Sequence, residues 1–171
     1  MIALPAPPLP YPPPMGEPKD AFAAAVAAQG DDPAIRAILE EVCAVTGMGF
    51  SAVARVTETR WIACQVLDKI EFGLNPGDEL DIKTTICDEI RASGCRVIID
   101  HVAANFEWRT HPVPMLYGFE SYASLPLLLA DGSFFGTLCA IDPEPRLLTS
   151  EETIAVLERC AERVAAILTA H

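Results

Sequence analysis

The chain has 171 residues, a length that suits one domain with a short tail. Hydrophobic residues make up 51% and charged residues 21%, which is typical of a globular protein. The net charge of −12 argues against a nucleic-acid partner, because phosphate binding needs clustered Lys and Arg. No apolar stretch reaches the roughly 18 residues of a membrane helix, and the first residues lack the basic start of a secretion signal. We therefore expect a cytoplasmic protein without a membrane partner.

Six cysteines are scattered along the chain without any CxxC pair or zinc-ligand spacing. This pattern predicts reduced, mostly buried thiols that fill core space, and it predicts no disulfide framework and no metal site. The cysteines are Cys43, Cys64, Cys87, Cys95, Cys139 and Cys160.

The first 30 residues divide into an arm and a short helix. Residues 1–18 hold eight of the fifteen prolines, which predicts an arm that is disordered or lies on a surface. Residues 19–30 are rich in alanine and predict a short helix that Gly30 ends. The main domain is expected over residues 31–171. It opens on a helix with Asp32 as its N-cap and Pro33 in the first turn, and this amphipathic helix ends at Gly47.

Strands and one short helix are predicted in the middle of the chain. Residues 50–56 and 61–67 read as a pair of strands, and residues 69–81 have loop composition. Thr84 and Thr85 are predicted to cap a short helix that ends at Gly94, and residues 95–100 form the next strand. Residues 101–119 contain many aromatic side chains and two prolines. We call them the aromatic connection and expect them to cover one face of the sheet.

Residues 121–143 predict a hairpin of two central strands. The runs 122–129 and 134–141 are apolar on both faces, and Asp131-Gly132-Ser133 supplies the turn between them. A final helix follows, with Thr149 and Glu152 in the positions of a capping box. Its apolar stripe suits a core-facing surface and equally a parallel dimer seam, and the sequence leaves both interpretations open. The stripe consists of Ile154, Leu157, Ala161, Val164 and Leu168.

This order of elements predicts an α/β (α+β) fold with a central antiparallel sheet of five to six strands. The terminal helices are expected on one face of the sheet, and the short helix and the aromatic connection on the other. A crevice between the sheet and this cover is the natural place for a small ligand.

The stretch YGFESYASLPLLLADGSFFGTLCAIDPEPR, followed by a capped terminal helix, resembles a GAF domain of the type found in bacterial sensor histidine kinases. The resemblance spans about residues 33 to 170 and implies a pocket on the distal face of the sheet. It also implies a homodimer through the terminal helices and a kinase or cyclase domain downstream. GAF domains bind cyclic nucleotides, tetrapyrroles, haem or other small molecules, and some bind nothing, so the fold alone does not choose the function.

Candidate ligand-binding residues follow from the aromatic connection and from the resemblance. Aromatic side chains suit the walls of a pocket for a flat ligand, and a histidine among them suits haem ligation or a hydrogen bond to a ligand. For His101 we expect only a cap on loop backbone, and for Phe119 a place in the core. The candidates are Trp61, Cys87, Phe106, Trp108, His111, Tyr117 and Tyr122.

A tetrapyrrole and a thiol enzyme are the specific alternatives. Thr110 stands before His111 where bilin-binding relatives carry a cysteine, which argues against covalent attachment there, although Cys87 or Cys64 could lie near the pocket. Methionine sulfoxide reductases of the GAF type use cysteines, but Met115 stands near the nucleophile's position and cannot do thiolate chemistry. We therefore predict no catalytic residue and a sensory or regulatory module with an unidentified ligand. A tetrapyrrole sensor, a dimerisation module without ligand and a thiol reductase are the alternatives.

Overall fold

The computed structural model describes residues 19–170, so the proline-rich arm predicted for residues 1–18 lies outside the described residues. The helices are α1 (Ala21–Gln29), α2 (Pro33–Thr46), α3 (Cys87–Ser93), α4 (Pro112–Tyr117) and α5 (Glu151–Thr169), with short 3-10 helices η1 (Ile82–Thr84) and η2 (Val102–Ala104). The strands are β1 (Phe50–Val56), β2 (Trp61–Asp68), β3 (Glu79–Leu80), β4 (Val97–Ile99), β5 (Ser121–Leu128) and β6 (Phe134–Asp142).

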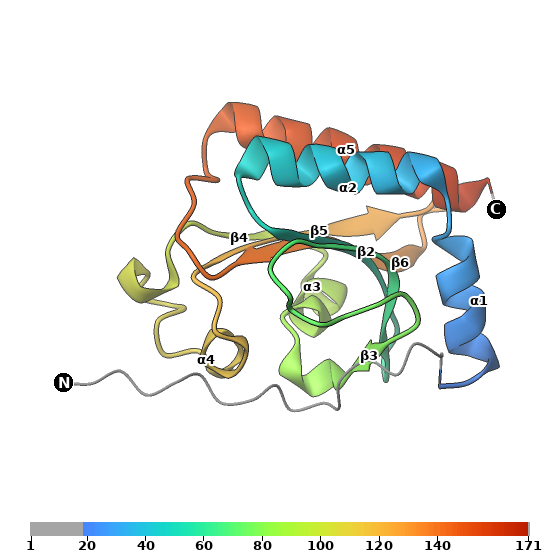
Figure 1. Ribbon diagram of the computed structural model, residues 1–171, viewed down its shortest axis with the longest axis horizontal. Coiled ribbons are helices and arrows are strands. Elements are labelled where there is room, and N and C mark those ends of the chain that lie inside the picture. The colour runs from blue at the N-terminus through green and yellow to red at the C-terminus, as the bar shows by residue number, and fades with distance from the viewer. Residues whose placement is uncertain (1–18, 171) are drawn as a thin grey trace.

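The six strands form one open antiparallel sheet in the order β3-β2-β1-β6-β5-β4. Helices α2 and α5 lie side by side across one face, and α3 and α4 lie on the other (Figure 1). This arrangement confirms the predicted fold class. The helix predicted for residues 19–30 is α1, which packs beside β2. Within the described residues no helix combines the length and the apolar composition needed to cross a bilayer.

Two predicted helix caps are wrong in detail. The N-cap of α5 is Ser150, whose Oγ accepts from the Thr153 N–H at 3.2 Å. Thr149 instead donates its hydroxyl to Asp100 Oδ2 at 2.8 Å, which fastens the start of α5 to the end of β4. Helix α3 begins after Ile86 without a side-chain cap, and the Thr85 hydroxyl donates to the Ile82 carbonyl instead. In both places a second hydrogen-bond partner competes for the threonine hydroxyl.

Strand β4 is shorter than predicted, because Cys95 and Arg96 lie before it as exposed residues. Its three residues pair with Tyr122–Ser124 only. Among the described residues, the outer edge of β5 beyond Ser124 therefore has no strand beside it. Pro126 falls in this stretch, where a missing backbone donor is tolerated.

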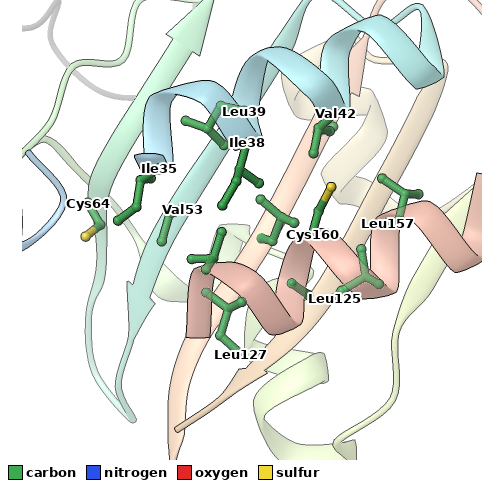
Figure 2. Packing of buried hydrophobic residues seen from close by; sticks show 14 of the residues in the cluster. Ile35, Ile38, Leu39, Val42, Val53, Cys64, Leu125, Leu127, Leu157 and Cys160 are labelled. Carbon is green, nitrogen blue, oxygen red and sulfur yellow. The ribbon is translucent and has the colours of Figure 1, made fainter. Parts of the chain in front are cut away.

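The larger core lies between the sheet and the helices α2 and α5 (Figure 2). Ile35, Ile38, Leu39 and Val42 of α2 point toward the strands, as their helical spacing requires. On α5, four of the five stripe residues are buried within the single chain, and Ile154 is half-buried. This burial agrees with a core role for the stripe, and its predicted part in a dimer stays a prediction. The buried four, which are already covered by the chain's own sheet and helix, are Leu157, Ala161, Val164 and Leu168.

Candidate functional site

The second face of the sheet carries a small cavity. On this face β1 and β2 present Ala52, Ala54 and Ala63, and these small side chains leave room for the segments that cover them. The cover consists of η1, α3, α4 and the loop after β2, and it encloses a cavity of about 50 Å³. The cavity is lined by Phe50, Trp61, Phe72, Leu74, Leu80, Thr84, Thr85, Ile86, Cys87, Val113, Tyr117, Phe119, Tyr122, Cys139 and Ile141.

The lining that the described residues provide is neutral, since it contains no Asp, Glu, Lys, Arg or His side chain. A charged molecule would lose its hydration there without gaining an opposite charge, which costs several kcal/mol or more. The volume admits a molecule of a few non-hydrogen atoms, because one water occupies about 30 Å³ of liquid. The cavity therefore selects for small and uncharged molecules.

Cys87 lies at the centre of a buried polar cluster on the cavity floor. Its Sγ lies 3.2 Å from the Thr137 Oγ1, 3.6 Å from the Tyr122 hydroxyl and 3.8 Å from the Ser124 Oγ. Tyr122 and Ser124 come from β5 and Thr137 from β6, whereas Cys87 is the first residue of α3. The cluster therefore joins the cover to the two central strands.

Cys139 is the second thiol beside this cluster, and it lines the same cavity as Cys87. It lies on β6 directly across from Ser124, two residues beyond Thr137 on the same face of the strand. The neighbouring Cys139 thiol, with help from Thr137, lowers the pKa of Cys87. The proximity of Cys87, together with burial, raises the pKa of Cys139. The two thiols therefore titrate together, and Cys87 loses its proton before Cys139 does.

Trp61 carries an unsatisfied donor at this cavity. Its side chain is only 3% exposed, and its Nε1 has no hydrogen-bond partner among the described residues. The indole lines the same cavity as Cys87, and a hydrogen bond from its N–H would lower the pKa of that thiol. While Cys87 is a neutral thiol, however, the donor stays unpaired. A buried unpaired donor costs about 1–3 kcal/mol, which a ligand with an acceptor atom would recover.

The rim of the cavity is formed by a hydrogen bond and by tilted ring contacts. The Thr84 Oγ1 and the Tyr117 hydroxyl lie 2.6 Å apart, which links η1 to α4. The Phe72 ring contacts Phe50 at 5.0 Å and Tyr117 at 5.9 Å between centroids. Burial raises the pKa of Tyr117, so its hydroxyl stays protonated. The rim is thus formed by three covering segments that meet at Tyr117.

Asp68, the last residue of β2, fixes the loop that carries Phe72. Its Oδ1 accepts from the N–H groups of Ile70 at 3.2 Å and Phe72 at 3.0 Å. Its Oδ2 accepts from the N–H of Gly73 at 2.8 Å. One carboxylate therefore satisfies three backbone donors in the wall of the cavity.

We expect Asp68→Ala to lower the free energy of unfolding by about 2–3 kcal/mol, because three partly buried N–H groups lose their acceptor. Chemical denaturation measures this loss, and hydrogen exchange should show faster exchange at Ile70, Phe72 and Gly73. Asp78→Ala is the matched control, because Asp78 accepts a single exposed bond from Asn75 N–H. Equal losses in the two variants would contradict this role of Asp68.

The structure brings four of the seven predicted ligand-binding residues to this cavity, namely Trp61, Cys87, Tyr117 and Tyr122. The other three lie outside its lining. Phe106 is 83% exposed and rests against the Arg109 guanidinium. Trp108 is buried and stacks on His111 at 4.7 Å between centroids. The aromatic connection therefore covers the sheet, but most of its rings are not directed into the cavity.

Both histidines of the aromatic connection have ordinary structural partners. His111 Nδ1 accepts from the Val113 N–H at 3.2 Å and caps α4, while its Nε2 lies 3.2 Å from Glu89. His101, expected to cap loop backbone, makes no capping bond and lies 3.6 Å from Glu120. No group of three His, Cys, Asp or Glu side chains suited to a metal ion occurs in the part of the chain that the structure describes.

One further prediction about a single residue needs correction. Cys64 lies on the opposite face of the sheet, where its thiol donates to the Val26 carbonyl at 3.3 Å, so it is remote from the cavity. Phe119 is buried in the core as expected, and it also contributes to the cavity wall and stacks on Tyr122. The six cysteines are free, and all but Cys95 are buried.

The sequence interpretation missed Cys139, Thr137 and Ser124 as parts of the site. Alternation along the strands could have indicated these residues. Thr137 and Cys139 lie on one face of β6, and Tyr122 and Ser124 lie on one face of β5. Small polar residues at alternate positions of strands that are otherwise apolar indicate a face that contains polar groups. The apolar run on both sides of each strand concealed this alternation.

The sequence matches the GAF domain family over residues 32–168. The chain belongs to the GAF domain family. None of the curated proteins matches it.

Several solved GAF-type structures resemble this domain, all at low sequence identity. The GAF domain region of a Geobacter sulfurreducens PCA protein has a TM-score of 0.66 at 14% identity, with 89% of this chain and 100% of that chain covered. Type II free methionine-R-sulfoxide reductase from Thermoplasma acidophilum has a TM-score of 0.60 at 12% identity, covering 86% and 94%. GAF-B of DevS from Mycobacterium smegmatis has a TM-score of 0.57 at 16% identity, covering 81% and 94%. These likenesses establish the fold.

A tetrapyrrole does not fit the cavity of this GAF domain. Ligand pockets for drug-sized molecules have volumes of about 300–1,000 Å³, whereas the space under the cover is about 50 Å³. Thr110 is exposed, and both ring nitrogens of His111 have partners already. Haem or bilin would need the cover to move away from the sheet.

A wider groove of about 600 Å³ lies on the other side of the GAF domain, between α5, the outer edge of β5 and residues 94–96. It is an open surface feature. Its Arg96 is paired with Glu158 at 2.7 Å, and its walls hold none of the buried polar cluster. The cavity beside Cys87 is therefore the better candidate for a specific site.

Proposed function

We propose that this GAF domain is a sensory module of bacterial signal transduction, which binds a small uncharged molecule in the cavity beside Cys87. The observation that carries this proposal is the buried indole N–H of Trp61, a residue of the cavity wall, which has no hydrogen-bond partner among the described residues. A donor in such a place is stabilised by a ligand with a carbonyl, sulfoxide or hydroxyl oxygen. The domain has no catalytic role in this proposal.

A route for the signal runs along α3 to the terminal helix. Cys87 begins α3 at the cavity, and three residues beyond its end Arg96 forms an ion pair with Glu158 of α5 at 2.7 Å. The pair is exposed, so it contributes little stability by itself. It does connect the cover of the cavity to the helix that would lead to an output domain. A shift of α3 on ligand binding would therefore change the surroundings of α5.

Fluorescence of a single tryptophan tests ligand binding. The chain contains two tryptophans, so Trp108→Phe leaves Trp61 as the only emitter. Acetamide, dimethyl sulfoxide and imidazole serve as small neutral probes, and cyclic AMP, haem and biliverdin as large ones. We expect at least one small probe to shift the Trp61 emission and raise Tm, because binding to the folded state alone stabilises it. The large probes should do neither.

Trp61→Phe is the decisive variant, because it keeps an aromatic ring and removes the N–H. We expect the rise in Tm caused by the small probe to be lost in this variant and retained in Trp108→Phe. Hydrogen exchange in α5, with and without the probe, measures the relay, and Arg96→Ala should remove the difference. Binding of haem or biliverdin, with no response to any small probe, would overturn the proposal.

A further inference from the structure

We propose that Cys87 and Cys139 form a peroxide-sensitive dithiol, in which hydrogen peroxide enters the cavity and the two thiols become a disulfide. This inference rests on the proposed function, because it identifies a ligand class and a mode of regulation for the same cavity. Its distinctive feature is a covalent change between α3 and β6, the two elements that carry these cysteines.

The two sulfurs occupy one buried site. Cys87 and Cys139 are 3% and 6% exposed, and both line the cavity. Cys87 Sγ lies 3.2 Å from the Oγ1 of Thr137, which precedes Cys139 by two residues on the same face of β6. It also lies 3.8 Å from the Oγ of Ser124, the residue of β5 that pairs with Cys139. Cys43, Cys64 and Cys160 are buried on the opposite side of the sheet or at its helices, where they contact the Ser51 hydroxyl, the Val26 carbonyl and the Glu41 carboxylate respectively. Within the described residues, this cavity therefore brings two buried thiols to one site.

The cavity suits hydrogen peroxide in size, charge and hydrogen bonding. Peroxide has two non-hydrogen atoms and no charge at neutral pH, so it fits a neutral space of about 50 Å³. Its oxygen can accept from the unpartnered Trp61 N–H. The hydroxyl groups of Tyr122 and Thr137 lie next to Cys87 Sγ and can hold the second oxygen. These two hydroxyl groups, at 3.6 and 3.2 Å from Cys87 Sγ, can donate to its thiolate, which makes Cys87 the nucleophile of the pair.

The chemistry balances in two steps. In the first, the Cys87 thiolate attacks one peroxide oxygen, the O–O bond breaks, and hydroxide leaves and takes up a proton as water. Cys87 is then a sulfenic acid. In the second, the Cys139 sulfur attacks the Cys87 sulfur, the S–O bond breaks, and hydroxide leaves with the proton of the Cys139 thiol as a second water. Two thiols and one peroxide thus give one disulfide and two waters, and a cellular thiol reductant restores the pair.

The disulfide would place a covalent bond between the cover and the sheet. Because Cys87 is the first residue of α3, the bond would fix the start of this helix on β6. It would also consume the Cys87 thiol and occupy space in the cavity. Oxidation should therefore exclude the small neutral probes as well as restrain α3.

Peptide mapping by mass spectrometry tests the inference on the full chain with its natural sequence. The protein is treated with hydrogen peroxide, remaining thiols are alkylated, and each cysteine is quantified. We expect a Cys87–Cys139 disulfide that forms at least about tenfold faster than Cys43 or Cys160 is oxidised, since one pKa unit changes the thiolate fraction tenfold. A thiol reductant should reverse it fully.

Matched variants complete the test. Cys95→Ser removes the exposed thiol and should leave the rate of disulfide formation unchanged. Cys139→Ser should let Cys87 stop at the sulfenic acid, which a dimedone-type reagent traps. Oxidation of Cys95 alone, or of all cysteines at similar rates, would overturn the inference. If the reduced protein binds a small probe but peroxide produces no disulfide, the inference is overturned and the proposed function stands. If the disulfide forms but no probe binds, only the proposed function is contradicted.

Discussion

Gly136→Ala is expected to lower the free energy of unfolding by about 3 kcal/mol or more, because the added methyl group meets backbone that cannot move aside. An ideal Cβ at this position lies 1.8 Å from the Ala54 carbonyl oxygen and 2.9 Å from the Val56 nitrogen. Gly136 of β6 pairs with Arg55 of β1 at the centre of the sheet. Strands β1 and β6 would have to move apart at a point where both contribute to the hydrophobic cores on the two faces of the sheet.

Gly132→Ala is the control for this prediction. Gly132 has φ +85° in the turn between β5 and β6, and an added Cβ there would have nothing within 4 Å. Its substitution therefore costs only the strain of a left-handed backbone, about 1–2 kcal/mol. Urea denaturation of both variants separates steric overlap from backbone strain. Losses within about 1 kcal/mol of each other would contradict the role of close strand packing at Gly136.

The fold followed from the sequence because its signals are local. The pattern Asp131-Gly132-Ser133 between two apolar runs specified the hairpin, and Asp32-Pro33 with Gly47 specified both ends of α2. Errors occurred where a distant residue decided a local choice. Thr149 and Ser150 are equally good caps by composition, and Asp100, 49 residues earlier, engages Thr149 and leaves Ser150 as the cap.

The site was less predictable, because its shape depends on contacts between segments far apart in the sequence. Trp61, Tyr117 and Tyr122 were expected as ligand-binding residues on aromatic content, and the structure brings them to one cavity. Phe106 has the same chemistry but lies exposed on its loop. Aromatic composition alone does not distinguish a ring that lines the cavity from a ring that lies exposed. The volume of the cavity, which decides the class of ligand, depends on Phe72, a loop residue that Asp68 fixes by hydrogen bonds.

Leu157→Ala is expected to lower the free energy of unfolding by about 3 kcal/mol without changing the oligomeric state. Leu157 is 1% exposed and belongs to the core between α2, α5 and the sheet. Truncation of a buried leucine costs about 2–5 kcal/mol, since transfer free energy is lost and a void remains. The buried side of α5 faces its own sheet, so a dimer would have to use other residues. Urea denaturation and sedimentation velocity measure the two quantities.

Ile154→Ala is the control on the same stripe, because Ile154 is half-buried one turn before Leu157. We expect it to lose less than half as much stability as Leu157→Ala, in proportion to the smaller apolar area that it removes from water. A homodimer, if it forms, should persist in both variants, since its contacts would involve the outward residues of α5. Dissociation of a dimer by Leu157→Ala at concentrations where the chain stays folded would show instead that the stripe is an intermolecular seam.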